Sequence, residues 1–447
     1  MINTHEQRRG VLILVQDLIF ATKIRSTAAS LGIESTSVRT AQELSRRLAE
    51  GPLPLVIVDL GASGDEALRA IVVARERADR PHIVAFVSHV EEELARRASA
   101  AGADEVLPRS RFNAQLPALL NTHCFAAHFA DRLLQAIGRT NAPVCVGLDP
   151  LFERLPPAIL QEHGLEHPAE SKTDPRDAEP AANALLQFGA ELIRIVAPHV
   201  PTIKINVAFF EPYHAAGFRT YFELVRLAQK AGLIVIGDVK RGDIGHSAEQ
   251  YAAAHLGGGM NAAGGPFAAD AVTVNSYLGY DGVKPFVDSC RAGGKGVFVL
   301  VQTSNPSAVE LQQVRLSEGI TLAERISKLV DQWSRTEGLI GQEGFSAVGA
   351  VVAPVNAETT RRLRESMPHC LFLVPGYGAQ GKSAEEVALC FKLDGTGAIV
   401  NASRSVIFAY EDQKYRGLYG DDWRRCIEAS CRDFVNAIRA VTPSPQT

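Results

Sequence analysis

The sequence predicts an α/β protein in which a doubly wound parallel sheet precedes a (β/α)8 TIM barrel. Strand-like apolar runs alternate with helical patterns along the 447-residue chain, as expected of parallel sheets with helical crossovers. Five such units occupy roughly the first 120 residues, and eight occupy about the next 320. We therefore place one domain at residues 1–122 and a second at residues 123–447.

The first block is expected to form a five-stranded parallel sheet with helices between the strands. Thr40 and Glu43 have the spacing of a helix capping box, and Gly32 and Gly102 stand where helices should end. The predicted strands are Val11–Val15, Ile33–Val38, Leu55–Asp59, His82–Ser88 and Asp104–Leu107.

The second block is predicted to begin with a helix at Phe129–Ile137. Its eight strand-like runs are almost continuously apolar, as strands buried on both faces require, and polar residues follow each run at the end where such barrels carry their chemistry. Gln161–Glu179 and Gly257–Gly265 are expected to be inserted loops. The predicted strands are Val144–Leu148, Thr202–Ala208, Leu233–Val239, Ala271–Tyr277, Gly296–Gln302, Ala347–Ala353, Leu371–Val374 and Ala398–Ala402.

The composition argues against nucleic-acid and membrane partners. Hydrophobic residues make up 46% of the chain and charged residues 21%, which is ordinary for a soluble globular protein. A net charge of −4 offers no basic surface for nucleic acid or anionic lipid. No apolar run is long enough to span a membrane, and the N-terminus is polar, unlike a signal peptide. We expect a cytoplasmic protein.

The cysteines and histidines indicate neither disulfides nor a metal site. The seven cysteines are scattered, odd in number and without CxxC spacing, so we expect reduced thiols. The twelve histidines form no ligand-spaced pair with cysteine or carboxylate residues, which argues against structural zinc.

The segment Asp238–Ile244 carries the clearest chemical signal. Residues two apart on a strand face the same side, so Asp238 and Lys240 should point into one space. A lysine between carboxylates stays protonated and is suited to delivering a proton to a carbanion. Alone, the pair could equally be a solvated salt bridge of little worth, and other motifs must decide.

Those motifs give the second block a specific resemblance. It resembles orotidine 5′-phosphate decarboxylase, in the longer bacterial-type branch, because several motifs occur in the right order over about 260 residues. They are Val146–Pro150, Ile203–Asn206, Asp238–Ile244, Asn275–Phe286, Gln302–Pro306, Pro375–Gly381 and Asn401–Ser405. Tyr280, Phe286 and Phe345 are expected in the core.

The resemblance implies a catalytic array of alternating charge without a metal or an organic cofactor. Lys240 would lie beside C6 of the pyrimidine, stabilise the carbanion and then protonate it. Lys204 would orient Asp238, which would lie near the departing carboxylate. Asp243 would reach into the active site of a second subunit, so a homodimer with shared sites is implied.

Substrate contacts follow from the same resemblance. Asp149 and Lys204 would bind the ribose hydroxyls, and Thr303 or Ser304 would contact the pyrimidine edge, with Ser304 preferred. Closure of Pro375–Gly381 would be driven by the distant phosphate contacts. Ser276 stands where the family commonly has proline, and Ser247 stands where it has threonine. The remaining implied substrate contacts are Ile244, Ser247, Pro375, Gln380, Ser403 and Arg404, of which Gln380, Ser403 and Arg404 would hold the phosphate.

The first block resembles the flavodoxin-like receiver domain of two-component response regulators. Asp59 ends the third strand, where that family carries its phosphoacceptor, and Asp17 and Ser88 fall at two further key places. The family's acidic pair is Gln16-Asp17 here, and Arg109, followed by Ser110 rather than proline, replaces its lysine. Both changes weaken a magnesium and phosphoryl site. A degenerate receiver that mediates interaction or dimerisation is favoured, with a regulatory partner through residues 1–122.

The implied activity is that of a carbon–carbon lyase of pyrimidine biosynthesis, forming UMP and CO2 from orotidine 5′-phosphate in the last step of de novo UMP synthesis. A sugar-phosphate decarboxylase or aldolase relative using Mg²⁺ is the first alternative, and loss of activity with EDTA would favour it. A regulatory pseudoenzyme is the second. A third combines an active barrel with regulation through phosphorylated Asp59.

Overall fold

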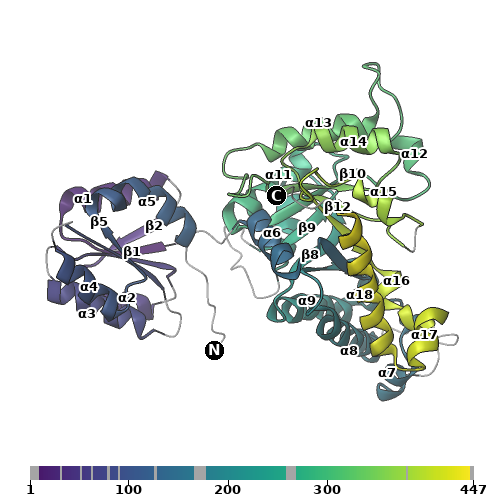
Figure 1. Cartoon of the computed structure of the whole chain (residues 1–447), viewed down its shortest axis with the longest axis horizontal. Coiled ribbons are helices and arrows are strands. Elements are labelled where there is room, and N and C mark those ends of the chain that lie inside the picture. Colours follow the sequence, from purple (N-terminus) through teal and green to yellow (C-terminus); the bar gives the residue numbers. More distant parts are fainter. Residues whose placement is uncertain are drawn as a thin grey trace. The chain divides into compact units, whose positions relative to one another are not determined.

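The computed structural model describes residues 10–30, 33–50, 53–61, 64–77, 81–88, 91–124, 128–165, 178–257, 268–378 and 381–442. These residues form two compact units, one ending at Cys124 and the other beginning at His128 (Figure 1). The domain boundary expected between residues 122 and 123 falls in the last turn of a helix, Arg109–Cys124. Gly32 and most of both expected loops (residues 166–177 and 258–265) lie outside the described residues.

The first unit is a five-stranded parallel sheet in the order β2-β1-β3-β4-β5. Apolar residues from α1 and α5 pack on one face, and residues from α2, α3 and α4 pack on the other. The elements are β1 (Gly10–Leu14), α1 (Leu18–Ser30), β2 (Glu34–Ser37), α2 (Ala41–Ala49), β3 (Leu55–Asp59), α3 (Gly64–Arg75), β4 (His82–Val87), α4 (Glu92–Ala101), β5 (Glu105–Pro108) and α5 (Arg109–Cys124).

Local signals in this unit act largely as expected. The Thr40 hydroxyl accepts a hydrogen bond from the Glu43 amide at 3.1 Å, which caps α2. In a regular capping box the Glu43 carboxylate would accept a hydrogen bond from the amide of the cap residue, Thr40. Here it accepts from the amide of the preceding residue, Arg39. Gly102 ends α4 with a φ of 107°, a left-handed conformation that glycine adopts without strain. All five predicted strands form, with ends that differ by one residue at most.

The second unit is a closed barrel of eight parallel strands, in which β13 pairs with β6 to complete the ring. The predicted strands at Thr202–Ala208 and Ala271–Tyr277 were too long, because the chain leaves the sheet after Asn206 and Val274. The strands are β6 (Val144–Leu148), β7 (Thr202–Asn206), β8 (Ile234–Arg241), β9 (Ala271–Val274), β10 (Gly296–Gln302), β11 (Val348–Val352), β12 (Phe372–Val374) and β13 (Ala398–Ala402).

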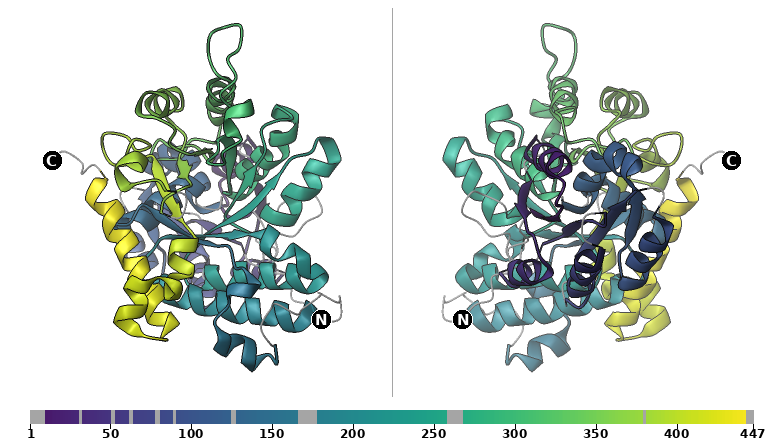
Figure 2. Two further views of the ribbon diagram at one scale, coloured as in Figure 1. Left: turned by 90° about the vertical axis from the view of Figure 1, so that its right-hand side faces the viewer. Right: turned by 90° about the vertical axis from the view of Figure 1, so that its left-hand side faces the viewer.

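Helices surround the barrel strands, as Figure 2 shows. Phe286 and Phe345 are buried as predicted, and Tyr280 is half-buried against the same core. The helices are α6 (Phe129–Thr140), α7 (Pro157–Glu162), α8 (Ala178–Val196), α9 (His214–Lys230), α10 (Gly245–Leu256), α11 (Tyr280–Gly293), α12 (Ala308–Leu311), α13 (Leu322–Ser334), α14 (Ala357–Ser366), α15 (Ala384–Ala388), α16 (Arg404–Ile407), α17 (Gln413–Tyr419) and α18 (Trp423–Val441), with 3-10 turns η1 (Phe152–Arg154), η3 (Val207–Phe209), η4 (Glu211–Tyr213) and η5 (Ala409–Glu411).

Helix α6 closes the amino-terminal end of the barrel. Phe129 packs edge-on against Phe298 at a centroid distance of 5.8 Å, and it lies so close to Gly296 that a Cβ there would collide with its ring. Leu133 joins the same buried cluster with inward-facing residues such as Ile236. The amino-terminal end is therefore filled with apolar side chains, which leaves the carboxyl end for polar chemistry.

All seven cysteines are buried free thiols. Among the described residues, no helix is long and apolar enough to cross a membrane.

Candidate active site

A cavity of about 400 Å³ opens at the carboxyl end of the barrel. Nine of the residues singled out from the sequence line it, together with residues that the sequence analysis did not place in the site. The lining residues are Asp149, Leu151, Lys204, Asn206, Phe209, Asp238, Lys240, Thr273, Leu300, Thr303, Ser304, Val351, Leu373, Pro375, Gly376, Tyr377, Asn401, Ser403 and Arg404.

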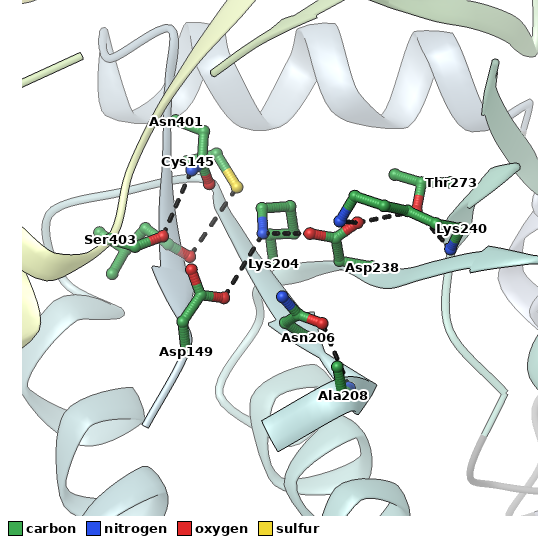
Figure 3. Close-up of polar contacts among 11 residues, drawn as sticks. Cys145, Asp149, Lys204, Asn206, Ala208, Asp238, Lys240, Thr273, Asn401 and Ser403 are labelled. Atoms are coloured by element: carbon green, nitrogen blue, oxygen red, sulfur yellow. Dashed lines mark hydrogen bonds and ion pairs between the residues drawn. The ribbon is translucent and has the colours of Figure 1, made fainter. Parts of the chain in front are cut away.

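Charged side chains form a continuous chain along one wall of the cavity (Figure 3). The ammonium of Lys204 lies 2.6 Å from Asp238 Oδ2 and 3.6 Å from Asp149 Oδ1. The ammonium of Lys240 lies 2.6 Å from Asp238 Oδ1. Each carboxylate oxygen of Asp238 therefore contacts a different lysine, which brings together three of the four residues of the array that the resemblance implies; the fourth, Asp243, is not among the residues that line this cavity.

Burial makes these charges strongly interdependent. Asp238 and Lys204 are each 6% exposed. Burial opposes ionisation of Asp238, but the ammonium groups of Lys204 and Lys240 outweigh it and hold the pKa of the carboxyl well below its usual range. Burial likewise opposes the charged form of Lys204, yet Asp149 and Asp238 raise its pKa above the ordinary value. Both groups are thus charged at neutral pH.

The backbone around Lys240 is irregular. Strand β8 places three residues, Asp238 to Lys240, opposite the single residue Thr273 of β9, which is a β-bulge of the kind found beside active sites. Lys240 has a φ of 43°, a left-handed conformation that costs a non-glycine residue about 1–2 kcal/mol. Asp238 and Lys240 do face each other as predicted, but the bulge, and not regular strand alternation alone, sets how they meet.

Thr273 is a site residue that the sequence analysis missed. Its hydroxyl donates to Asp238 Oδ1 at 2.8 Å and accepts from the Lys240 amide at 3.0 Å. One side chain therefore fixes both the carboxylate and the strained backbone of the lysine. A signal was present, because Thr273 is the one polar residue in the buried run Ala271–Val274, and a buried polar group requires partners.

Ser403 lines the same cavity as Asp149. Gly147 permits this arrangement, since a Cβ at that position would lie 1.9 Å from the Ser403 hydroxyl. The Asn401 amide lies 3.4 Å from the same hydroxyl. Arg404 begins α16, and its exposed side chain lies at the cavity rim. Gln380, the third predicted phosphate contact, lies outside the described residues.

Thr303 and Ser304 follow β10 and line the cavity together. The Thr303 hydroxyl is engaged within its own loop, because it donates to Asn305 Oδ1 at 2.6 Å and accepts from the Gln312 amide at 2.7 Å. Gln312 also accepts a hydrogen bond from the Thr303 backbone amide at 2.8 Å. These bonds hold the loop and favour Ser304 over Thr303 as the residue that faces a ligand.

The segment after β12 combines a rigid start with a glycine-rich turn. Pro375 is half-buried at the cavity wall, and Gly376 follows with a φ of 97°. Gly378 and Gly381 also have positive φ, and the Gly381 amide donates to the Gly378 carbonyl. A side chain at these three positions would be strained, so the glycines shape the turn and are not merely a flexible spacer.

Three predicted site residues do not line the cavity of their own chain. Asp243 is half-buried, and one oxygen accepts from the following amide of Ile244. Ile244 is 56% exposed although it is a large apolar residue, and Ser247 is exposed on the first turn of α10.

The predicted phosphoacceptor Asp59 lies at the end of β3 in the first unit and is 1% exposed. Arg109 contacts both carboxylate oxygens at 3.3 Å, and the Gly61 amide donates to Oδ1 at 3.0 Å. Asp17 accepts from the amides of Ile19 and Phe20 and so caps α1. Across the described parts of both units, no cluster of three His, Cys, Asp or Glu residues is arranged to hold a metal ion.

The comparison with known protein families identifies the second unit. Residues 143–416 match the family described as "Orotidine 5′-phosphate decarboxylase / HUMPS family", a span within the second unit. An orotidine 5′-phosphate decarboxylase of Rhodopirellula baltica is 38% identical over 314 residues, covering 70% of this chain and 96% of that protein. One from Caldicellulosiruptor bescii is 36% identical, covering 64% and 91%. The structure of Leishmania donovani OMP decarboxylase has a TM-score of 0.52 at 26% identity, covering 71% and 99%.

Proposed function

The chain belongs to the orotidine 5′-phosphate decarboxylase / HUMPS family, and we propose that it converts orotidine 5′-phosphate to UMP and CO2 as a carbon–carbon lyase of pyrimidine biosynthesis. The observation that carries the proposal is the contact of Asp238 with both Lys204 and Lys240 at the cavity wall. An array of this kind can stabilise a carbanion with protein groups alone.

Lys240 is the residue proposed to act on the reacting carbon. When the bond between C6 and the carboxylate breaks, its electron pair remains on C6 as CO2 leaves. The ammonium of Lys240 stabilises this charge and then transfers a proton from Nζ to C6, which gives UMP and a neutral amine that is reprotonated from solvent. The left-handed backbone of Lys240 and its bond to Thr273 aim the ammonium in advance of the reaction.

Asp238 has two proposed roles. It keeps the array ordered, because its two oxygens hold two ammonium groups at 2.6 Å. Its permanent negative charge would also lie near the substrate carboxylate, which disfavours the bound substrate relative to the transition state, where that charge is being lost.

The remaining cavity residues are proposed to hold the substrate. Asp149 and Lys204 would bind ribose hydroxyls, and Ser304, with Thr303 behind it, would contact the pyrimidine edge. Pro375 would pack beside the ligand. Ser403, Arg404 and Gln380 would bind the phosphate, for which the Arg404 guanidinium offers a two-pronged donor.

We propose a homodimer in which each active site is completed by its partner. Asp243, Ile244 and Ser247 fit this role because they lie on the segment that follows the array yet do not line the cavity of their own chain. The exposure of Ile244 is costly for an apolar side chain in water and is relieved in an interface.

For residues 1–122 we propose a degenerate receiver-like domain that serves an interaction or dimerisation partner. The ion pair of Asp59 with Arg109 and the use of Asp17 as a helix cap support this. Both carboxylates are thereby committed to protein contacts, whereas a phosphorylated receiver needs them for Mg²⁺ and the phosphoryl group.

The deciding experiment is UV-monitored decarboxylation of orotidine 5′-phosphate by the full-length chain in the presence of EDTA. Loss of substrate with formation of UMP is expected. Turnover that requires added Mg²⁺ would favour a sugar-phosphate-type relative, and no turnover by folded protein would indicate a pseudoenzyme.

A further inference from the structure

Arg241, which directly follows the proposed catalytic lysine, is joined to two neighbouring segments outside the cavity. Its guanidinium lies 2.6 Å from Glu211 Oε1, which belongs to η4 after β7. It also lies over the ring of Tyr251 on α10, 5.2 Å from the centroid. Neither Arg241 nor Glu211 lines the cavity proposed to hold the substrate.

Arg241 anchors the backbone of β8 immediately after Lys240. Strand pairing is interrupted after Gly237 and resumes at Arg241, which pairs with Val274 and accepts a hydrogen bond from the Asn275 amide at 2.8 Å. Lys240 is thus the last residue of the bulge, with its left-handed φ next to the point where the strand is anchored again.

A strained residue keeps its conformation only where its surroundings fix both sides of it. The Thr273 hydroxyl holds the amide of Lys240 on the first side. On the second side, Arg241 itself is held in place by its backbone hydrogen bond to Asn275 and by its contacts with Glu211 and Tyr251. Without that anchor, Lys240 can relax toward a right-handed conformation, which would turn its ammonium away from Asp238.

We propose that Arg241 and Glu211 are a positioning pair. They hold Lys240 in its left-handed conformation and so maintain the rate at which Lys240 supports decarboxylation and proton transfer. This inference rests on the proposed decarboxylase function for its kinetic test. Arg241 and Glu211 act through Lys240, and they should affect turnover more than substrate binding.

The chain offers a matched control in the ion pair Arg226–Glu223. The side chains of Arg226 and Glu223 are 27% and 32% exposed, close to the 26% and 36% of Arg241 and Glu211. Both control residues lie on α9, so their loss removes an ion pair of similar exposure that includes no residue of β8.

The test measures three variants of the full-length protein: Arg241→Met, Glu211→Gln and the double variant that combines them. The control variant is Arg226→Met. For Arg241→Met we expect kcat to fall by roughly 10- to 100-fold, because a misplacement of about 1 Å can cost that much, with KM changed by less than about threefold. The double variant should be no worse than Arg241→Met, since the two residues act as a unit. Arg241→Lys should restore much of the rate, and Arg226→Met should behave as wild type.

A second readout does not depend on catalysis. Hydrogen exchange should accelerate at residues 238–243 in Arg241→Met and not in Arg226→Met, because loss of the anchor lets the bulge open more often and separates the Lys240 amide from the Thr273 hydroxyl. Wild-type kcat in folded Arg241→Met, or additive losses in the double variant, would overturn the inference. If Arg241→Met fails to fold, Glu211→Gln decides by the same kcat-against-KM comparison. An inactive wild-type enzyme would refute the decarboxylase function, and exchange would still decide whether the pair holds the bulge.

Discussion

Asp59 and Asp238 are both buried carboxylates at the carboxyl ends of parallel strands, β3 in the first unit and β8 in the barrel. Asp59 meets one cation, Arg109, which contacts both of its oxygens at 3.3 Å. Asp238 meets two lysines at 2.6 Å and a threonine at 2.8 Å beside an open cavity.

The contrast shows what turns a strand-end carboxylate into a reactive site. Arg109 neutralises Asp59 within the protein, and little charge remains for a ligand. Around Asp238 two lysines share the carboxylate, and Lys240, which lines the cavity, is half-exposed, with 49% of its side chain accessible. An array with one accessible cation can stabilise negative charge that develops on a substrate.

The strongest test of this contrast removes the accessible lysine of the array, Lys240. We expect Lys240→Ala to lower kcat by at least roughly 10³-fold, because both proton delivery and charge stabilisation are lost. Size-exclusion chromatography should show an unchanged assembly. Near-normal UV-monitored turnover by this variant would refute the proposed mechanism.

Replacement of the buried Lys204 tests the electrostatic coupling within the array. Lys204→Met leaves Asp149 and Asp238 without their shared cation, and breaking a buried ion pair of this kind costs about 3–5 kcal/mol. Denaturant unfolding should show this loss of the free energy of unfolding. The control Lys284→Met breaks an exposed pair with Asp288 and should change it by less than about 1 kcal/mol. Equal stability of the two variants would contradict the description of the array as buried and interdependent.

The pH dependence of stability should differ between the units because the barrel holds a buried histidine. Burial lowers the pKa of His255 from 6.5 to about 4, and the charge of nearby Arg241 adds to the shift. The unfolded chain therefore binds a proton that the folded barrel does not, and stability falls as pH decreases from about 6.5 to about 4, by on the order of 3 kcal/mol.

Tryptophan fluorescence can follow this transition in the barrel alone, since both tryptophans, Trp333 and Trp423, lie there. The variant His255→Gln should show a shallower decline over the same pH range. An unchanged slope would mean that another group governs acid unfolding.

The smallest effect is expected in the first unit. Asp59→Asn and Arg109→Met should leave decarboxylation within about twofold of wild type, because neither residue belongs to the barrel or shares a partner with the catalytic array. Mass spectrometry after incubation with acetyl phosphate should detect no phosphoryl group on Asp59. Stoichiometric labelling accompanied by changed turnover would instead establish a regulatory receiver.

Much of the fold could be predicted from local patterns. Strands such as Val144–Leu148 and Ala398–Ala402 were located to the residue, because continuous apolar runs between helical segments leave few alternatives. The helix at Phe129 was also predicted, although its packing into the end of the barrel was not. The predicted strands ran past their true ends at Asn206 and Val274. Apolar residues continue beyond Asn206, and after Val274 the chain leaves the sheet at the polar pair Asn275-Ser276.

The sequence alone placed nine of the cavity residues at or just after strand ends, because the period of a strand and the polarity of barrel ends are local properties. Only the tertiary structure decided how they act. The bulge of β8, the double contact of Thr273 and the pairing of Arg241 with Glu211 join residues about 30 or more positions apart. Such contacts depend on neighbouring strands and loops meeting in space, and no spacing within one segment encodes them.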